Sequence, residues 1–354
     1  MNLRIVPLAL LCGVLAGVTI RAASEATQPA EPVRGSEGRL LVLNKEDDTL
    51  MVFDEPTHKR LATVKVGDEP HEVAVTPDGR KAYVANVHDR TISVVDLKTY
   101  GVVATLRPEH ADYPHGMAIS PDGSRLYLTS EGSHRLYVID TVRDVVERSI
   151  TISQAGSHLI ALTRVGHRGW VANRGSDSVS LFDLPSLRVL KTIKVGPGPE
   201  GIAASANGRW VVVALQKAGQ VAILDASKAE LITRLPAGQV PIRVACAPQM
   251  PVALVSNRAS DDVTVLDLAA RQVVTTVQVG RRPGGVTFND RGTRAYVANG
   301  ESKSVTVFTV PGYERTAEIE TGAGPDGIAY VPAAAAAAHP PKAQKKPAGP
   351  AGGR

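Results

Sequence analysis

One strand-like motif recurs seven times at intervals of 42 to 44 residues, and this regularity restricts the fold more than any other feature of the chain. Each copy is a short apolar run that usually ends in Asn. The seven copies are Leu41-Val42-Leu43-Asn44, Tyr83-Val84-Ala85-Asn86, Tyr127-Leu128-Thr129-Ser130, Trp170-Val171-Ala172-Asn173, Val212-Val213-Ala214-Leu215, Leu254-Val255-Ser256-Asn257 and Tyr296-Val297-Ala298-Asn299. A repeat of this length indicates a propeller or a solenoid, in which each unit buries its apolar surface against its neighbours.

Each unit contains three further apolar runs, and the residues between them are turn formers. One run ends in Asp, as in residues 92–96, and the next is followed by Gly, as in residues 273–280. The last begins after a Pro and leads through a tight turn such as Pro77-Asp78-Gly79 to the next copy of the motif. Four short strands in each of seven units predict an all-β, seven-bladed β-propeller of four-stranded blades around a central channel.

The phase of the repeat predicts how the ring closes. The chain enters at the second strand of a blade, over residues 39–44, and finishes on a first strand, over residues 327–331. The N- and C-terminal strands must therefore share the closing blade, with three strands from the N-terminus and one from the C-terminus. Because such a ring needs no partner to cover its edges, we expect a monomer.

The sequence predicts four parts, which are a signal peptide (1–26), a linker (27–37), the propeller (38–332) and a disordered Ala/Pro/Lys tail (333–354). The first part has the layout of a secretory signal, with Arg4, an apolar stretch over residues 5–20 and small residues from Ala22 onward. We therefore expect an exported protein, periplasmic or secreted, with no integral membrane domain after cleavage. An uncleaved membrane anchor is the alternative, although the stretch is short for a full span.

Charge argues against a nucleic-acid partner once the ends of the chain are set aside. Six of the 40 Lys and Arg lie in the predicted signal and tail, which leaves 34 against 35 Asp and Glu in the whole chain. The blades carry no basic block and few aromatic residues. A groove for nucleic acid is therefore not expected.

The histidines are unevenly distributed over the repeat. Six of the nine fall near one face of three consecutive blades, and three of these directly follow the Pro or Ser that opens an innermost strand. Those three are His71, His115 and His158. In the remaining blades the same position holds Glu200, Ile242, Gly284 and Asp326. Because equivalent positions of adjacent blades lie side by side, we expect these side chains to meet at one mouth of the channel.

Converging imidazoles and carboxylates suit a divalent metal such as zinc, copper, magnesium or manganese. The candidate metal ligands are His71, His115, His158 and Glu200. A solvated polar rim without a metal is the alternative. Further candidates for ligand binding on the same face are Glu72, Glu131, Asn173 and Asp326, and the acid/base candidates for catalysis are Glu131 and Glu200.

The motifs resemble those of a known family. Tyr83-Val84-Ala85-Asn86, Tyr296-Val297-Ala298-Asn299 and the run from Pro70 to Gly79 are similar to the YVTN-type, YncE-like seven-bladed β-propeller repeat. This resemblance covers about residues 38–332. It implies the fold, whereas propellers of this kind include binding and surface proteins as well as lactonases, lyases and redox enzymes.

Together these features predict an exported binding or interaction protein of the cell envelope, with a His-rich ligand or metal site at one channel mouth. Its partner there would be a small molecule or an envelope protein. The alternative function is a metal-assisted hydrolase or lyase that acts on a lactone-like small molecule.

Overall fold

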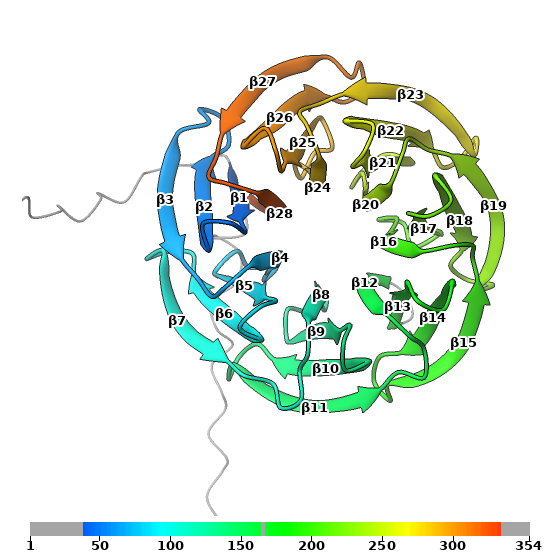
Figure 1. Cartoon of the computed structure of the whole chain (residues 1–354), viewed down its shortest axis with the longest axis horizontal. Helices are drawn as coiled ribbons and strands as arrows, with labels where there is room; N and C mark the ends of the chain where they lie inside the picture. Colours follow the sequence, from blue (N-terminus) through cyan, green and yellow to red (C-terminus); the bar gives the residue numbers. More distant parts are fainter. Residues whose placement is uncertain (1–37, 164–166, 334–354) are drawn as a thin grey trace, which may run out of the picture. The chain divides into compact units, whose positions relative to one another are not determined.

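The computed structural model describes residues 38–163 and 167–333, all within one compact unit, Gly35–Arg354. These residues form 28 strands in seven antiparallel sheets of four, arranged as blades around a central channel (Figure 1). The predicted seven-bladed propeller is confirmed. The predicted signal peptide (1–26) and linker (27–37), and nearly all of the predicted tail (333–354), lie outside the described residues.

From the innermost strand outward, the seven sheets are β28 (Pro325–Pro332), β1 (Gly38–Asn44), β2 (Thr49–Asp54) and β3 (Arg60–Lys65); β4 (Pro70–Val75), β5 (Lys81–Asn86), β6 (Thr91–Asp96) and β7 (Gly101–Leu106); β8 (Pro114–Ile119), β9 (Arg125–Ser130), β10 (Arg135–Asp140) and β11 (Val145–Thr151); β12 (Ser157–Thr163), β13 (Arg168–Asn173), β14 (Ser178–Asp183) and β15 (Arg188–Lys194); β16 (Pro199–Ala204), β17 (Trp210–Leu215), β18 (Gln220–Asp225) and β19 (Glu230–Pro236); β20 (Pro241–Cys246), β21 (Val252–Asn257), β22 (Asp262–Asp267) and β23 (Gln272–Gln278); and β24 (Pro283–Phe288), β25 (Arg294–Asn299), β26 (Ser304–Thr309) and β27 (Arg315–Glu320).

The closing blade joins the two ends of the described chain, as predicted. Its order is β28-β1-β2-β3, and β28 pairs with β1 in an antiparallel register that places Ile328 opposite Val42. The backbone hydrogen bonds of this pair replace a covalent closure, so the ring has no open edge between its first and last strands.

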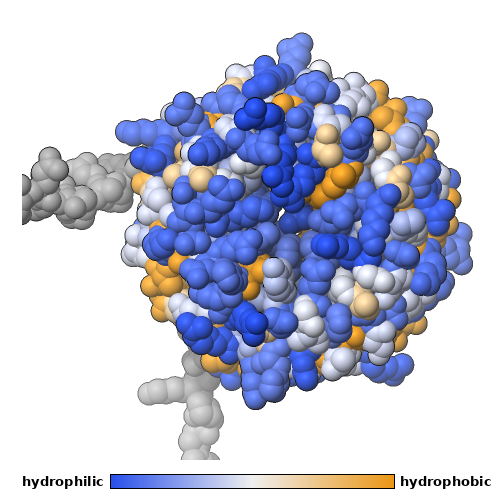
Figure 2. Space-filling view, in the orientation of Figure 1, coloured by the Kyte–Doolittle hydropathy of each residue, from blue (hydrophilic) through white to orange (hydrophobic). Residues whose placement is uncertain are grey.

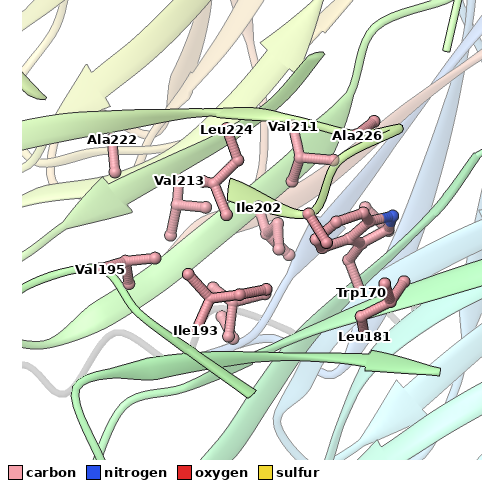
Figure 3. Packing of buried hydrophobic residues seen from close by; sticks show 14 of the residues in the cluster. Trp170, Leu181, Ile193, Val195, Ile202, Val211, Val213, Ala222, Leu224 and Ala226 are labelled. Carbon is pink, nitrogen blue, oxygen red and sulfur yellow. The ribbon is translucent and has the colours of Figure 1, made fainter. Parts of the chain in front are cut away.

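The apolar core lies between the blades. The two middle strands of each blade are buried on both faces, as in β17, whereas an outermost strand such as β23 alternates between exposed residues and partly or fully buried ones. One interblade cluster packs Trp170 of β13 and Ile193 of β15 against Ile202 of β16 and Val213 of β17 (Figure 3). Burial on both faces explains why the recurring motif reads as a continuous apolar run.

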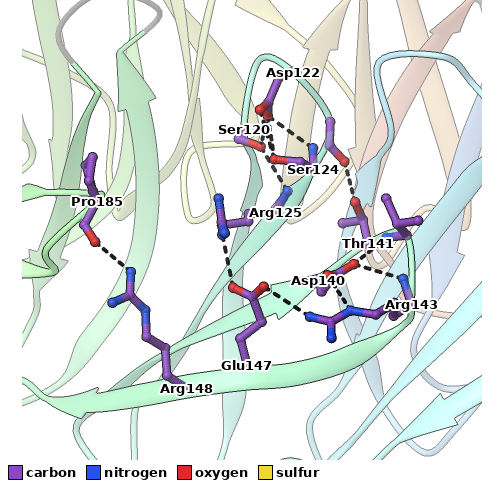
Figure 4. Close-up of polar contacts among 12 residues, drawn as sticks. Ser120, Asp122, Ser124, Arg125, Asp140, Thr141, Arg143, Glu147, Arg148 and Pro185 are labelled. Carbon is purple, nitrogen blue, oxygen red and sulfur yellow. Dashed lines mark hydrogen bonds and ion pairs between the residues drawn. The ribbon is translucent and has the colours of Figure 1, made fainter. Parts of the chain in front are cut away.

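Polar contacts order the turns at the end of the blades where β8 leads into β9 and β10 leads into β11. Asp122 accepts hydrogen bonds from Ser124 N and from the hydroxyl groups of Ser120 and Ser124, and Arg125 Nε lies 3.0 Å from Glu147 Oε2 (Figure 4). Arg148 donates to the carbonyl oxygen of Pro185 in the next blade at 2.7 Å. These contacts fix the turns and tie neighbouring blades together.

Candidate functional site

The site begins at the second residue of each innermost strand. This position carries, around the ring, His71, His115, His158, Glu200, Ile242, Gly284 and Asp326. In all seven blades the register between the innermost strand and its neighbour shifts at or beside this residue. A β-bulge bends the strand and re-aims its side chains, so the same irregularity presents all seven positions in the same way.

The three predicted imidazoles meet. The ring centroids of His71 and His115 are 5.1 Å apart, and those of His115 and His158 are 4.0 Å apart. Gly116 allows this close approach, because an added Cβ would lie 2.4 Å from the carbonyl oxygen of His158. His115 and His158 are almost fully buried. Burial, with the nearby positive charge of Arg243, lowers the pKa of both imidazoles well below the ordinary value, so both are neutral near pH 7.

Carboxylates flank the outer two imidazoles of this stack. His71 Nδ1 lies 3.2 Å from Asp326 Oδ2, and its Nε2 lies 3.3 Å from Glu69 Oε1. Lys45 Nζ also contacts Asp326, at 3.3 Å. Burial raises the pKa of Asp326, but the hydrogen bond from His71 and the charges of Arg243 and Lys45 outweigh it and hold that pKa well below the usual range. Asp326 is therefore a fixed negative charge.

On the other side of the stack, Glu131 Oε2 lies 3.6 Å from His158 Nε2. Arg174 Nη1 lies 3.8 Å from Glu131 and 4.0 Å from Glu200, so one guanidinium group serves both carboxylates. Burial raises the pKa of Glu200 above its ordinary value, against the opposing charges of Arg243 and Arg174. Both acid/base candidates of the sequence therefore lie beside the imidazole stack.

Arg243 is the principal site residue that the sequence reasoning missed. It follows Ile242 on β20, and its Nη2 lies 2.7 Å from Glu72 Oε1 on β4. The blades of β4 and β20 are not neighbours in the ring, so this ion pair spans the channel (Figure 1). Arg243 Nη1 lies 3.6 Å from Glu200 Oε1, and the whole residue is only 8% exposed.

A sequence signal for the Glu72–Arg243 pair did exist. The third position of the innermost strands is Gly in four blades and Leu159 in another, and the remaining two blades carry Glu72 and Arg243. Two side chains of opposite charge stand out at a position of the repeat that is otherwise mostly Gly. Burial raises the pKa of Glu72, although the charge of Arg243 opposes the shift.

Several buried polar atoms of the site have no hydrogen-bond partner among the described residues. They include His115 Nδ1, His158 Nδ1 and Arg243 Nε, and the carboxylate oxygens Glu72 Oε1 and Glu200 Oε2. Buried polar atoms are paired in the great majority of cases, so a group of them at one place indicates a position for exogenous hydrogen-bonding groups. Figure 2 shows one face of the ring, with hydrophilic residues gathered around its centre.

A cavity of about 450 Å³ adjoins the imidazole stack. It is lined by Lys45, Glu46, Asp48, Asp68, Glu69 and His88. Lys45 and Glu69 are the same residues that contact Asp326 and His71, which connects the cavity to the site. A larger cavity, of about 740 Å³, lies at the other end of β4 around Pro77 and Pro121 and contains none of the predicted site residues.

Asn173 is placed differently from the other predicted residues. Its amide Nδ2 donates to Ser178 Oγ and Ser180 Oγ within its own sheet, at 3.2 and 2.9 Å, and its Oδ1 accepts from Ser157 Oγ at 3.2 Å. It therefore anchors the residue that precedes His158. Asn86, Asn257 and Asn299 make similar contacts in their blades, which identifies a structural element of the repeat.

No group of three or more His, Cys, Asp or Glu side chains within residues 38–163 and 167–333 is arranged to hold a metal ion. The three imidazoles are adjacent, but Arg243 places a positive charge close to His115 and His158. Metal binding by His71, His115, His158 and Glu200 stays a prediction. In the same described residues, no helix is long and apolar enough to cross a membrane.

Comparison with known proteins identifies similar chains. A family model described as a YNCE-like β-propeller matches residues 1–145 and 169–294. No curated protein matches the chain. Among solved structures, Kuenenia stuttgartiensis hydrazine synthase is 24% identical with a TM-score of 0.69, and the match covers 75% of this chain and 91% of that one.

Two further structures are similar in fold. A functionally unknown protein from Desulfotomaculum acetoxidans DSM 771 is 15% identical with a TM-score of 0.73, over 84% of this chain and 99% of that one. The dihydro-heme d1 dehydrogenase NirN, in complex with DHE, is also 15% identical, with a TM-score of 0.65 over 86% of this chain and 78% of that one. At these identities the likeness shows the fold alone.

Proposed function

The chain belongs to the YNCE-like β-propeller family, and from that premise we propose that it is an exported binding protein whose ligand docks at the channel mouth beside His71, His115 and His158. One observation carries this proposal, namely the group of buried, unpartnered polar atoms on His115, His158 and Arg243. The signal-peptide layout of residues 1–26 supports export.

Stability alone does not account for the polar cluster. The blades pack through apolar interblade clusters, and the closing blade is joined by backbone hydrogen bonds. Each buried polar atom left without a partner costs about 1–3 kcal/mol. An array of such atoms at one end of the channel is therefore better explained by ligand binding than by folding.

The test is ligand-induced thermal stabilisation of the full chain. Wild-type protein and His115→Phe would be screened against carboxylates, alkyl diamines, and zinc, copper, magnesium and manganese ions. A ligand that binds the native state raises the melting temperature by mass action. We expect at least one class to stabilise the wild type and to lose its effect in His115→Phe.

His110→Phe is the matched control, because His110 lies in an exposed turn. It should respond like the wild type. If no ligand class shifts the wild-type melting temperature, or if His115→Phe responds unchanged, the channel mouth is not the binding site.

A metal-assisted hydrolase or lyase acting on a lactone-like molecule is the second candidate. The favouring observation is that Glu131 and Glu200 lie beside the neutral imidazoles, with Glu131 3.6 Å from His158. Metal content of untagged protein would be measured by mass spectrometry beside a His71/His115/His158 triple Ala variant, together with hydrolysis of lactone substrates. Stoichiometric metal that is lost in a folded triple variant would support this candidate; metal-free, inactive protein after incubation with the four ions would eliminate it.

A further inference from the structure

The chemistry of the ligand can be inferred from the charges that are already paired. Asp326 contacts Lys45 and His71, Glu131 contacts Arg174 and His158, and Glu72 pairs with Arg243. The carboxylates of the site therefore have cationic or imidazole neighbours within the chain. Two of their oxygens, Glu72 Oε1 and Glu200 Oε2, have no hydrogen-bond partner among the described residues, but Arg243 lies within ion-pair distance of both carboxylates.

Most of the buried polar atoms of the site that have no hydrogen-bond partner in the described part of the chain are nitrogen atoms. Arg243 Nε, His115 Nδ1 and His158 Nδ1 are buried without hydrogen-bond partners among residues 38–163 and 167–333. Arg243 Nε is always a donor, and a neutral imidazole can donate from either nitrogen. The three atoms come from β20, β8 and β12, so they approach the channel from different blades. Such a set of donors calls for an acceptor with more than one oxygen.

The positive charge of Arg243 favours an anionic ligand over a cationic one at this position. Its guanidinium group stays protonated when buried, and it lies close enough to His115 and His158 to affect both. A metal ion or an ammonium group at the same place would meet this fixed positive charge in a weakly screened environment. An anion would be attracted to it in competition with Glu72 and Glu200, the carboxylates that already lie beside it.

The form of the anion follows from the guanidinium geometry. Carboxylates bind arginine through two parallel hydrogen bonds, and the Nε and Nη2 atoms offer one such edge. Glu72 already contacts Nη2 of Arg243, whereas Nε is unpartnered. Glu72, Glu200 and Asp326 all act on the charge of Arg243, so a single negative charge is easier to accommodate here than the near-double charge of phosphate.

We propose that the ligand is a small monocarboxylate anchored by Arg243, and that Glu72 is a built-in competitor for the same guanidinium group. This inference rests on the proposed function of the channel mouth as a ligand site. His115 then donates a hydrogen bond to the carboxylate from Nδ1, and His158 does so when its single proton is on Nδ1 rather than on Nε2, which faces Glu131. Release of Glu72 from Arg243 accompanies tight binding.

Calorimetric titration of the full chain with benzoate tests the proposal through two substitutions that act in opposite directions. Arg243→Gln removes the anchor and should weaken benzoate binding by about 10- to 100-fold, the effect of losing a charge-assisted hydrogen bond. Glu72→Gln removes the competitor and should strengthen binding by about 3- to 10-fold. A merely structural ion pair would weaken binding in both variants.

Arg125→Gln serves as the control, because it removes an equal charge from an exposed ion pair at the other end of the blades. It should leave the affinity unchanged. Glu72→Gln keeps the test decisive even if Arg243→Gln does not fold, because a merely structural ion pair predicts no gain in affinity. No gain in a folded Glu72→Gln variant overturns the proposal.

Titration with other ligands distinguishes a failure of the carboxylate inference from a failure of the proposed function on which it rests. If zinc or putrescine binds in a His115-dependent manner while benzoate does not, the channel mouth is a ligand site but the carboxylate inference is wrong. Tighter binding of inorganic phosphate than of benzoate would also overturn it. If none of these probes binds, the proposed function fails together with the inference.

Discussion

At the scale of single residues, the site depends on polar groups that the fold holds in unfavourable surroundings. His115 and His158 are buried and neutral, and Arg243 is buried but paired with Glu72. Neither imidazole can be protonated without a positive charge entering a site that already holds Arg243. The same groups that make the site chemically distinctive therefore make the protein sensitive to acid.

The first residue-scale prediction concerns this sensitivity. The pKa of His115 is lowered in the folded state, so below about pH 6.5, the ordinary histidine value, the unfolded chain binds a proton that the folded chain does not. Stability is then lost as the pH falls from this value toward the lowered pKa, by up to about 1.4 kcal/mol per pH unit for one proton. His115→Gln should remove this loss.

Urea unfolding at several pH values between 5 and 8 measures the difference between wild type and His115→Gln. Because the opposing contributions of Glu72 and Glu200, whose pKa values are raised by burial, are present in both proteins, the difference isolates His115. His110→Gln, in an exposed turn, should follow the wild type. Parallel pH profiles for wild type and His115→Gln would contradict the prediction.

At the scale of strands, one device is repeated in all seven blades. Each innermost strand opens with Pro or Ser and shifts its register within its first four residues, and in four blades a Gly follows the site position. The Gly lets one innermost strand approach the backbone of the next. Gly116 does this between β8 and β12, and the distance between His115 and His158 depends on it.

Gly116→Ala should therefore disturb both the packing of these strands and the imidazole stack. Its Cβ would lie 2.4 Å from the carbonyl oxygen of His158 and 2.6 Å from Cα of Leu159, and neither backbone atom can move alone. Overpacking of this kind costs about 1–3 kcal/mol. Urea unfolding measures the loss, and ligand affinity should fall with it.

Gly101→Ala is the matched substitution for comparison, in the outermost strand β7. There an added Cβ would have its nearest contact at 3.7 Å, which is an ordinary separation. We expect a stability within about 0.5 kcal/mol of the wild type. Equal effects of the two substitutions would show that the spacing at Gly116 is not critical.

At the scale of the whole molecule, closure of the ring determines stability. The closing blade is completed by β28, which packs beside β24 and β4 as well as pairing with β1. β28 also supplies Asp326, so the same strand closes the ring and completes the charge arrangement around His71. Loss of the strand affects fold and site together.

A chain that ends before Pro325 should lose cooperative unfolding and tend to aggregate, because β1 would then present an unpaired edge. A chain that ends at residue 333 retains every described strand and should unfold like the full chain. Circular dichroism during urea titration and light scattering compare the two truncations. Unchanged stability without β28 would contradict the role of this strand in closure.

The sequence by itself determined the fold, the number of blades and the manner of closure, because repeat length and turn residues are local properties that recur seven times. It also brought His71, His115 and His158 to one mouth, since equivalent positions of a ring must lie side by side. Only the tertiary structure decided what these residues meet. The pairing of Glu72 with Arg243 joins strands of blades that are neither adjacent in the ring nor close in sequence, and the loss of charge on the buried imidazoles depends on burial. Neither property can be obtained from a repeat pattern, because both depend on the width of the channel and on the side chains that cross it.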